Sequence, residues 1–308
     1  MCIDELNALA ESDGMNEFIR VCEARQCKAL SKIADDIVAR KGVRLVLLAG
    51  ASSAGKTTTA KRLCTQLRVN GAAAIHFSTD DYFVGDARNP RGPDGELDYE
   101  TVDAVDAARL AADLNSLMHG DTIHPRKFDF VRHEGFDAKE LMTVPKGGYI
   151  VLEGIHALNP KLTAGVRNSA KFRMFVEPVT QPEVFFRTRL SPADARLMRR
   201  LVRDNQFRKM SPVETFRLWP KVLAGEEKWI KPFRQNTDAD FDSSLAYEIC
   251  VLKPYVAGLL EIVKRKKPSE AKAQVLSELL STVVPVPPVA VPGDSILRET
   301  IGSSQLEY

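Results

Sequence analysis

The chain has 308 residues, of which 44% are hydrophobic and 27% charged, and its formal net charge is +2. A net charge this close to zero gives no indication that the protein binds nucleic acid or a membrane surface. No apolar run approaches the roughly 20 residues of a membrane span, and the N-terminal residues lack a secretory core. The five cysteines are scattered without a C-x-x-C pair, which favours reduced thiols. We therefore expect a cytoplasmic protein without a nucleic-acid or membrane partner.

The residues before the first predicted strand are expected to be helical. One helical face is formed by Leu30, Ile33, Ala34, Ile37 and Val38. Gly42 then favours an end to the helix. We expect residues 1–42 to form a helical extension that packs on a sheet, and we assign no chemistry to it.

The stretch from residue 43 to residue 59, VRLVLLAGASSAGKTTT, is the strongest functional signal. A buried parallel strand is predicted first, and residues 50–57 then match the phosphate-loop pattern G-x-x-x-x-G-K-[ST], before a helix that reaches residue 69. In such a loop Lys56 reaches the β- and γ-phosphates and the Thr57 hydroxyl ligates Mg²⁺. The residues expected to bind the nucleotide are Gly50, Ser52, Ser53, Ala54, Gly55, Lys56, Thr57 and Thr58. We predict binding of ATP or GTP with Mg²⁺.

Two acids follow predicted buried strands at residues 72–77 and 149–153. Ligands of open parallel sheets bind beyond the carboxyl ends of the strands, so Asp80 should lie beside the phosphate loop. We predict that Asp80 is the catalytic base and that Lys56 acts with it; an aspartate that merely caps a turn is the alternative. Glu153 ends the later strand, where an acid holds or orients Mg²⁺.

The segment between these two strands is less regular. A Gly- and Pro-rich loop, residues 84–100, precedes a helix predicted at 102–118. Residues 123–133 then alternate aromatic and polar side chains, which favours a hairpin or an extended arm. His133 and an aromatic side chain there could contact a flat ligand, although a half-buried strand with a surface histidine fits the same pattern.

A further strand at residues 171–176 makes four strands separated by helical stretches. This order predicts an α/β fold, a doubly wound parallel sheet of the P-loop NTPase class, with the phosphate-loop domain at residues 43–264. A helical lid is predicted at about residues 191–210, where Ser191 caps a helix. One face of that helix carries Arg196, Arg199, Arg200 and Arg203, which would cover the phosphates, although a basic stripe is also typical of a solvated face.

The last residues, 265–308, contain a proline-rich tract at 283–292 that cannot continue a helix or enter a sheet interior. Three apolar side chains follow it, Ile296, Leu297 and Ile301. Leaving them free would expose apolar surface, so we predict that this tail docks on the phosphate-loop domain or on a neighbouring copy in a homo-oligomer.

The motifs together resemble the phosphoribulokinase and uridine kinase group, and more narrowly the uridine kinase-like nucleoside kinases that are often fused to a domain related to threonyl-tRNA synthetase. The matching segments are GASSAGKTTTAKRL, STDDYF, RKFDFVRH, VLEGIHALNP and ARLMRRLVRD, in this order. The resemblance covers roughly residues 30–304. It implies phosphorylation of a nucleoside, uridine or cytidine, at its 5′-hydroxyl, with ATP or GTP as donor.

The resemblance also implies roles for single residues. Asp80 would take the proton of the 5′-hydroxyl, Phe130 and His133 would contact the nucleobase, and Glu153 would lie near Mg²⁺. Phe128 stands where the family has a base-contacting tyrosine, and Asp98 and Glu100 compete for the position of the ribose-binding acid. Arg199, Arg200 and Arg203 match the lid, with Arg199 and Arg203 on the nucleotide. The remaining substrate-binding candidates are Tyr82, Arg196 and Arg200.

Other functions are compatible with a phosphate loop. A kinase for another small hydroxylated metabolite, such as a sugar phosphate, would use the cations Arg126, Lys127 and Arg132. A regulatory GTPase switch needs D-x-x-G and N-K-x-D motifs, and neither is present at the required place. A nucleotide-binding module without catalysis is the third alternative.

Overall fold

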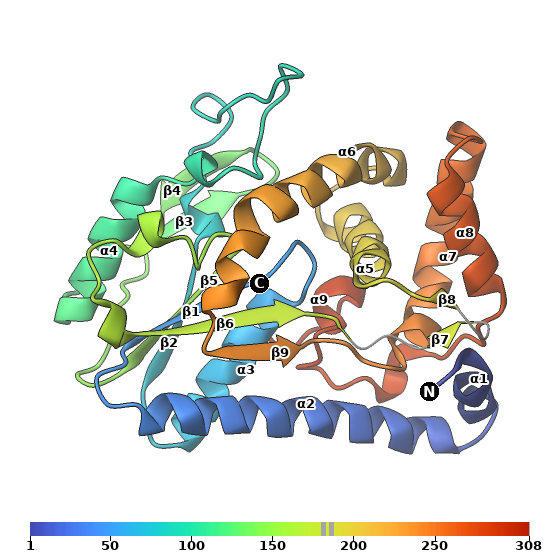
Figure 1. Ribbon diagram of the computed structural model, residues 1–308, viewed down its shortest axis with the longest axis horizontal. Coiled ribbons are helices and arrows are strands. Elements are labelled where there is room, and N and C mark those ends of the chain that lie inside the picture. The colour runs from blue at the N-terminus through green and yellow to red at the C-terminus, as the bar shows by residue number, and fades with distance from the viewer. Residues whose placement is uncertain (180–182, 185–187, 308) are drawn as a thin grey trace.

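The computed structural model describes residues 1–179, 183–184 and 188–307, and it is built around one parallel sheet (Figure 1). The strands run in the order β2-β5-β1-β6-β9, and every neighbouring pair is parallel. Their bounds are β1 Leu45–Ala49, β2 Ala74–Ser78, β5 Tyr149–Glu153, β6 Lys171–Glu177 and β9 Ala239–Asp242. The predicted doubly wound α/β sheet is confirmed, with β9 as a fifth strand that the sequence pattern does not indicate.

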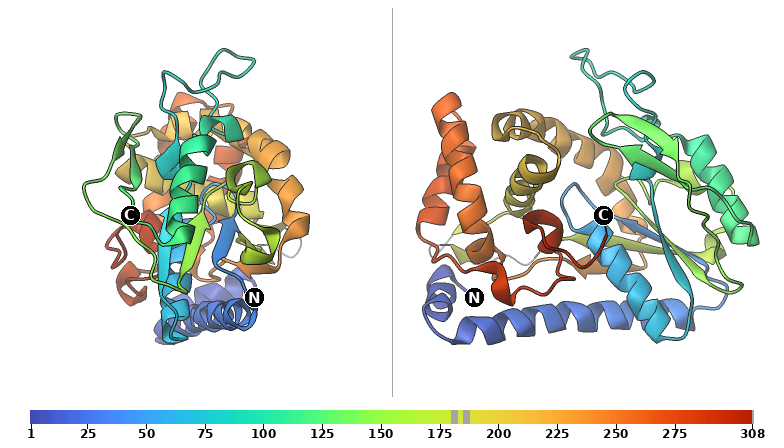
Figure 2. Two further views of the ribbon diagram at one scale, coloured as in Figure 1. Left: turned by 90° about the vertical axis from the view of Figure 1, so that its left-hand side faces the viewer. Right: turned by 180° about the vertical axis from the view of Figure 1, so that it is seen from behind.

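Helices cover both faces of the sheet (Figure 2). Alternate side chains of β1 point to opposite faces, so Leu45 and Leu47 join one core with α4, while Val46 and Leu48 join another with α2 and α3. The helices are α1 Ile3–Ala10, α2 Gly14–Ala39, α3 Lys56–Val69, α4 Ala107–His119, α5 Pro192–Phe207, α6 Pro212–Gly225, α7 Glu248–Lys266, α8 Ala271–Ser281 and α9 Arg298–Ile301.

A further core lies among helices α1, α5, α6, α7 and α8, beside the sheet (Figure 1). The long helix α2 spans both parts, because Ile19 packs in the helical core and Ile37 packs under the sheet. Four of the five residues on its expected apolar face are buried, and Val38 is exposed. No helix of the described residues is long and apolar enough to cross a membrane.

Two antiparallel hairpins complete the structure. β3 (Arg126–Asp129) pairs with β4 (Glu134–Asp137), and β7 (Glu183–Val184) pairs with β8 (Thr188–Arg189). The first of them is one of the two forms, a hairpin or an extended arm, that the alternation of aromatic and polar residues favours. The expected helix from residue 102 begins later, because the Asp106 side chain caps α4 by accepting the Arg109 N–H at 3.1 Å.

The C-terminal tail packs against the rest of the chain. Ile296 is 1% exposed and lies in the core below the sheet, whereas Leu297 and Ile301 are buried in the helical core. The tail therefore joins the two parts of the molecule, and in Figure 2 its end lies close to the N-terminus of α3.

Candidate active site

One cavity lies at the carboxyl ends of the sheet strands, between the phosphate loop, the β3–β4 hairpin and helices α5 and α6. The predicted residues that line it are Ser52, Ser53, Gly55, Lys56, Thr57, Asp80, Glu100, Phe128, Phe130, His133, Arg200 and Arg203. The predicted residues outside its lining are Gly50, Ala54, Thr58, Tyr82, Asp98, Glu153, Arg196 and Arg199. Lining residues that the sequence does not indicate are Phe83, Leu97, Tyr99, Ile155, Arg208, Met210, Leu218, Lys221, Val222 and Glu299.

The phosphate loop has the tight turn that its glycines predict. Gly55 has a φ of +85°, a conformation that favours glycine, and α3 begins immediately after it. Gly50 serves packing instead, because a Cβ there would lie 2.2 Å from the Val176 carbonyl oxygen. Lys56 is buried, and its ammonium donates to the Ala51 carbonyl at 3.1 Å. Burial lowers the pKa of Lys56, while Glu153 and Asp80 act against that shift.

A polar corner lies beside the loop, at the end of β5. Glu153 Oε1 accepts hydrogen bonds from the hydroxyls of Thr57, at 3.1 Å, and Ser78, at 2.8 Å. Burial alone would raise the pKa of Glu153, but His76 and Lys56 hold that pKa below its ordinary value. The ionised carboxylate keeps its second oxygen buried without a hydrogen-bond partner. That orphaned oxygen beside the Thr57 hydroxyl fits a Mg²⁺ ion or its water.

The protein side chains of this corner do not form a complete metal-binding site by themselves. No group of three or more His, Cys, Asp or Glu side chains in the described parts of the chain could hold a metal ion. Mg²⁺ typically binds one or two protein oxygens and takes its other ligands from phosphates and water. The corner therefore suits an ion that arrives with a nucleotide.

Asp80 follows β2 and begins a short 3-10 turn, Asp80–Tyr82. The turn directs Asp80 into the cavity beside Lys56, and it buries Tyr82 in the core, where the phenol donates to Asp113 Oδ2 at 2.7 Å. Burial raises the pKa of Asp80 to about 6, and repulsion by Glu153 adds to the shift. A carboxylate with this pKa is suited to accept a proton near neutral pH.

Aromatic side chains form the end of the cavity nearest the hairpin. The ring of Phe128 lies 5.6 Å from that of Phe83 and 5.2 Å from that of Phe130, both edge-on. Tyr99 and His133 continue this wall, with ring centroids 5.9 Å apart. A flat ligand could stack or pack edge-on against such a set of rings. Phe83 belongs to the same STDDYF motif as Asp80, and only the local 3-10 turn decides that it, rather than Tyr82, reaches the cavity.

Glu100 and Asp98 occupy different positions. Glu100 lines the cavity, and burial raises its pKa to about 7, against the attraction of Arg200. Asp98 instead accepts the backbone N–H of Glu100 at 3.0 Å and supports the turn. Of the two sequence candidates, only Glu100 faces the cavity.

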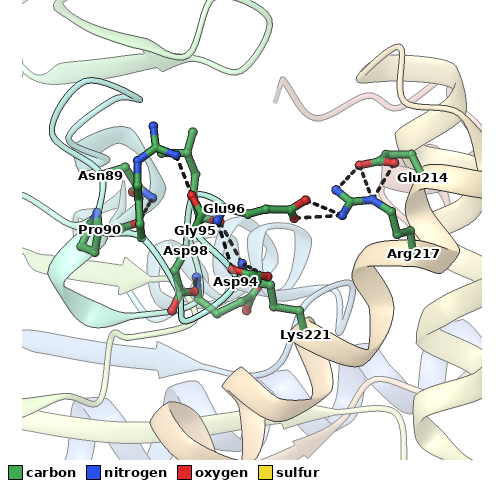
Figure 3. A network of polar contacts seen from close by, with 12 residues as sticks. Asn89, Pro90, Asp94, Gly95, Glu96, Asp98, Glu214, Arg217 and Lys221 are labelled. Carbon is green, nitrogen blue, oxygen red and sulfur yellow. Dashed lines mark hydrogen bonds and ion pairs between the residues drawn. The ribbon is translucent and has the colours of Figure 1, made fainter.

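The loop that carries these acids is tied to α6 by ion pairs (Figure 3). The Arg217 guanidinium binds both carboxylate oxygens of Glu96, at 2.7 and 2.9 Å, and also Glu214 on its own helix. Lys221 lies 3.4 Å from Asp94 and donates to the Leu97 carbonyl at 3.2 Å. These contacts hold the loop over the side of the cavity nearest α6.

The four arginines of α5 separate into two pairs. Arg200 and Arg203 line the cavity, and Arg200 donates to the Ser52 hydroxyl at 2.8 Å. Arg196 and Arg199 are each 1% exposed and lie outside the lining, which differs from the expectation that they contact substrate and nucleotide. Ion pairs hold both of them. Arg196 pairs with Glu226 at 2.6 Å, and Arg199 pairs with Glu248.

These buried pairs also support the phosphate loop. Arg196 donates to the Ser52 carbonyl at 3.2 Å, and Arg199 donates to the Ser53 carbonyl at 3.5 Å. Arg208 supplies a further cation to the cavity, with its guanidinium 4.7 Å above the Phe130 ring. Helix α5 therefore contacts both the loop backbone and the cavity.

The burial of Arg199 predicts a stability effect. Arg199→Gln should lower the free energy of unfolding by about 3 to 5 kcal/mol, because it leaves the buried Glu248 carboxylate without its cation. Chemical denaturation measures this change. Arg217→Gln is the matched control, since its ion pairs are exposed and screened by solvent, and its loss should change the free energy of unfolding far less. Equal stability of Arg199→Gln and the parent would contradict the structural role of Arg199.

A model of the phosphoribulokinase / uridine kinase family matches residues 45–249 of the chain. The chain belongs to this family. A uridine kinase of Deinococcus deserti is 28% identical over 165 residues, which cover 54% of this chain and 70% of that protein. A uridine kinase of Aliivibrio salmonicida is 27% identical over 223 residues, which cover 70% of this chain and 95% of that protein. The solved structure of a possible uridine kinase from Bacillus stearothermophilus is 18% identical, with a TM-score of 0.48. The match covers 71% of this chain and 100% of that one.

Membership of the family confirms the resemblance inferred from the motifs and identifies a phosphotransferase that acts on a nucleoside or another small metabolite. The match covers the phosphate loop, Asp80, Glu153 and the arginines of α5. It ends before α8 and the C-terminal tail.

Proposed function

We propose that this kinase transfers the terminal phosphoryl group of ATP or GTP to the 5′-hydroxyl of a nucleoside, with uridine or cytidine as acceptor. The observation that carries the proposal is one cavity in which Asp80 lies between the phosphate loop and a wall of aromatic rings. Relatives named uridine kinase support the choice of acceptor.

In this mechanism each end of the cavity has one task. The phosphate loop and Lys56 bind the triphosphate, and Arg200 and Arg203 neutralise charge on the group that moves. Mg²⁺, held through Thr57 and Glu153, would add charge neutralisation at the β- and γ-phosphates. The rings of Phe128 and Phe130 hold the base, His133 contacts its edge, and Glu100 accepts hydrogen bonds from ribose hydroxyls.

Asp80 then completes the transfer. It accepts the proton of the 5′-hydroxyl while that oxygen forms a bond to the γ-phosphorus, and the bond from this phosphorus to the bridging oxygen breaks. The products are a nucleoside 5′-monophosphate and a nucleoside diphosphate. Because the cavity orients both reactants, positioning supplies much of the rate enhancement.

The sugar-phosphate alternative has weaker support. Its three candidate cations, Arg126, Lys127 and Arg132, lie outside the cavity lining. Lys127 pairs with Asp81 at 3.0 Å, and Arg132 lies 3.7 Å from Asp129. Aromatic rings form most of the acceptor end, with Arg208 over one of them, and such a wall suits a base better than a second phosphate.

A panel of acceptors tests the proposal. With Mg²⁺ and either ATP or GTP, we expect uridine or cytidine to give the 5′-monophosphate, detected by chromatography. 5′-Deoxyuridine, which lacks the attacking hydroxyl, should bind without turnover. Turnover with ribulose 5-phosphate and with no nucleoside would establish the metabolite alternative, and nucleotide binding with no turnover of any acceptor would favour a regulatory module.

The aromatic wall predicts a variant with an effect on the acceptor alone. Phe130→Ala should raise the KM for the nucleoside about fivefold, since one ring contact is worth on the order of 1 kcal/mol, and should leave the KM for ATP unchanged. Phe136→Ala is the matched control, because Phe136 is on the same hairpin, is 54% exposed and lies outside the cavity lining. Equal effects of the two variants would argue against a base-binding wall.

A further inference from the structure

The C-terminal tail reaches the phosphate loop, although it lies outside the part of the chain that the family model matches. Its segment 295–301 contains α9, which packs against α5. Ser295 and Ile296 are 0% and 1% exposed, so the segment is held firmly against the kinase core. Two of its side chains contact the loop and the first turn of α3.

The first of these contacts is between Ile296 and Gly55. A Cβ added to Gly55 would lie 2.6 Å from Ile296 Cγ2, closer than carbon atoms approach in proteins. Gly55 is the residue immediately before α3, where the loop amides point at phosphate. Ile296 therefore packs directly on the turn that shapes the anion site.

The second contact is made by Glu299. Its carboxylate accepts a hydrogen bond from the Thr58 hydroxyl at 2.8 Å, and Glu299 also lines the cavity. Thr58 is fully buried in the first turn of α3, next to Thr57 of the polar corner. The negative charge of Glu299 acts on Lys56 and Arg203, two of the cations that line the cavity.

We propose that segment 295–301 shapes the nucleotide site and contributes to nucleotide affinity, and that Glu299 is a positioning residue within it. Through Thr58, the carboxylate holds the first turn of α3 in the conformation that binds phosphate. Its charge is not required for this task, because the hydrogen bond needs only an acceptor oxygen, and a negative charge near the cavity opposes a triphosphate. The inference rests on the proposed nucleotide site and adds a determinant of donor affinity beyond residue 249.

Two substitutions separate the acceptor oxygen from the charge. Glu299→Gln keeps an oxygen for Thr58 and loses the charge, so it should bind the nucleotide at least as tightly as the parent. Glu299→Ala loses both and should bind about tenfold more weakly. Thr58→Val deletes the hydroxyl, and adding Glu299→Ala to it should weaken binding by much less than Glu299→Ala weakens it in the parent, because the contact between the two side chains is already broken.

The experiment is calorimetric titration of the full chain with the β,γ-imido analogue of ATP and Mg²⁺, with the thermal midpoint measured for each variant. Glu278→Ala is the matched control, an exposed glutamate of the same C-terminal region. A lower midpoint for Glu299→Ala at an unchanged Kd would mean a merely structural role and would overturn the proposal. Glu299→Gln binding as weakly as Glu299→Ala would overturn it too, because the charge of Glu299, acting through Lys56 or Arg203, and not its acceptor oxygen would then determine the affinity.

The same titration separates this inference from the proposed function. If the parent fails to bind the analogue, the nucleotide site itself is wrong and the inference fails with it. If the parent binds, Lys56→Ala does not, and Glu299→Ala binds like the parent, then only the role of the tail is refuted.

Discussion

Lys56→Ala should reduce phosphoryl transfer by at least a hundredfold while the fold stays intact. The Lys56 side chain is buried in the phosphate loop and lines the cavity, where we propose that it binds the β- and γ-phosphates. Removing one preorganised group that stabilises transition-state charge typically costs about 10² to 10³ in rate. Initial rates with saturating acceptor and Mg²⁺-ATP measure the loss.

The effect of Lys56→Ala must be separated from damage to the fold. Lys28→Ala changes an exposed lysine of α2, far from the cavity lining, and should keep the parental rate. The thermal midpoint of Lys56→Ala should remain near that of the parent, because burial disfavours the charge that is removed. A rate within threefold of the parent would show that the loop does not bind the transferring phosphates.

The parts of the fold that the sequence predicts well are those whose signals are local. The strand, the glycine loop and the helix around residues 43–69 follow one another without interruption, so their pattern predicts both structure and ligand. Asp80 and Glu153 could be placed for the same reason, since Glu153 ends an apolar strand and Asp80 comes two residues after another. Strand β9 is not predicted from the sequence, because its four residues, ADFD, include two acids and no apolar run.

The arginines of α5 show why helical spacing alone is not sufficient. Residues three and four apart share a face of the helix, and the sequence cannot say which of them meets a partner. Glu226 and Glu248, supplied by later segments, bind Arg196 and Arg199 and leave Arg200 and Arg203 for the cavity. This separation depends on tertiary contacts.

Long-range contacts explain the other cavity residues that the sequence missed. Glu299 comes to Thr58 from 241 positions away, so no window of the sequence contains both. Tyr99 and Arg208 lie in segments without a motif of their own, and they face the cavity because the loop before α4 and the end of α5 fold over it. The choice between Asp98 and Glu100 likewise needs the backbone turn that buries one of them.

Asp80→Asn should reduce phosphoryl transfer by about 10² to 10⁴, the usual contribution of a general base. The amide has the size of the carboxyl group but cannot accept the proton of the acceptor hydroxyl. Asp81→Asn is the matched control: Asp81 is the adjacent acid, lies outside the cavity lining and pairs with Lys127 at 3.0 Å. Its transfer rate should stay within a few-fold of the parental rate. Equal losses in the two variants would mean that Asp80 is not the base.

The pH dependence of kcat/KM provides a second test of Asp80, because it reports groups of the free enzyme. A base is active only when ionised, and burial with repulsion from Glu153 raises the pKa of Asp80 to about 6. Protonation of Asp80 should therefore lower the parental kcat/KM by at least about tenfold per pH unit below that pKa. Glu100, with a pKa of about 7, is the other cavity acid that titrates nearby. Glu100→Gln should keep the decline below pH 6 and weaken acceptor binding, whereas loss of that decline in Glu100→Gln would transfer the role of base to Glu100.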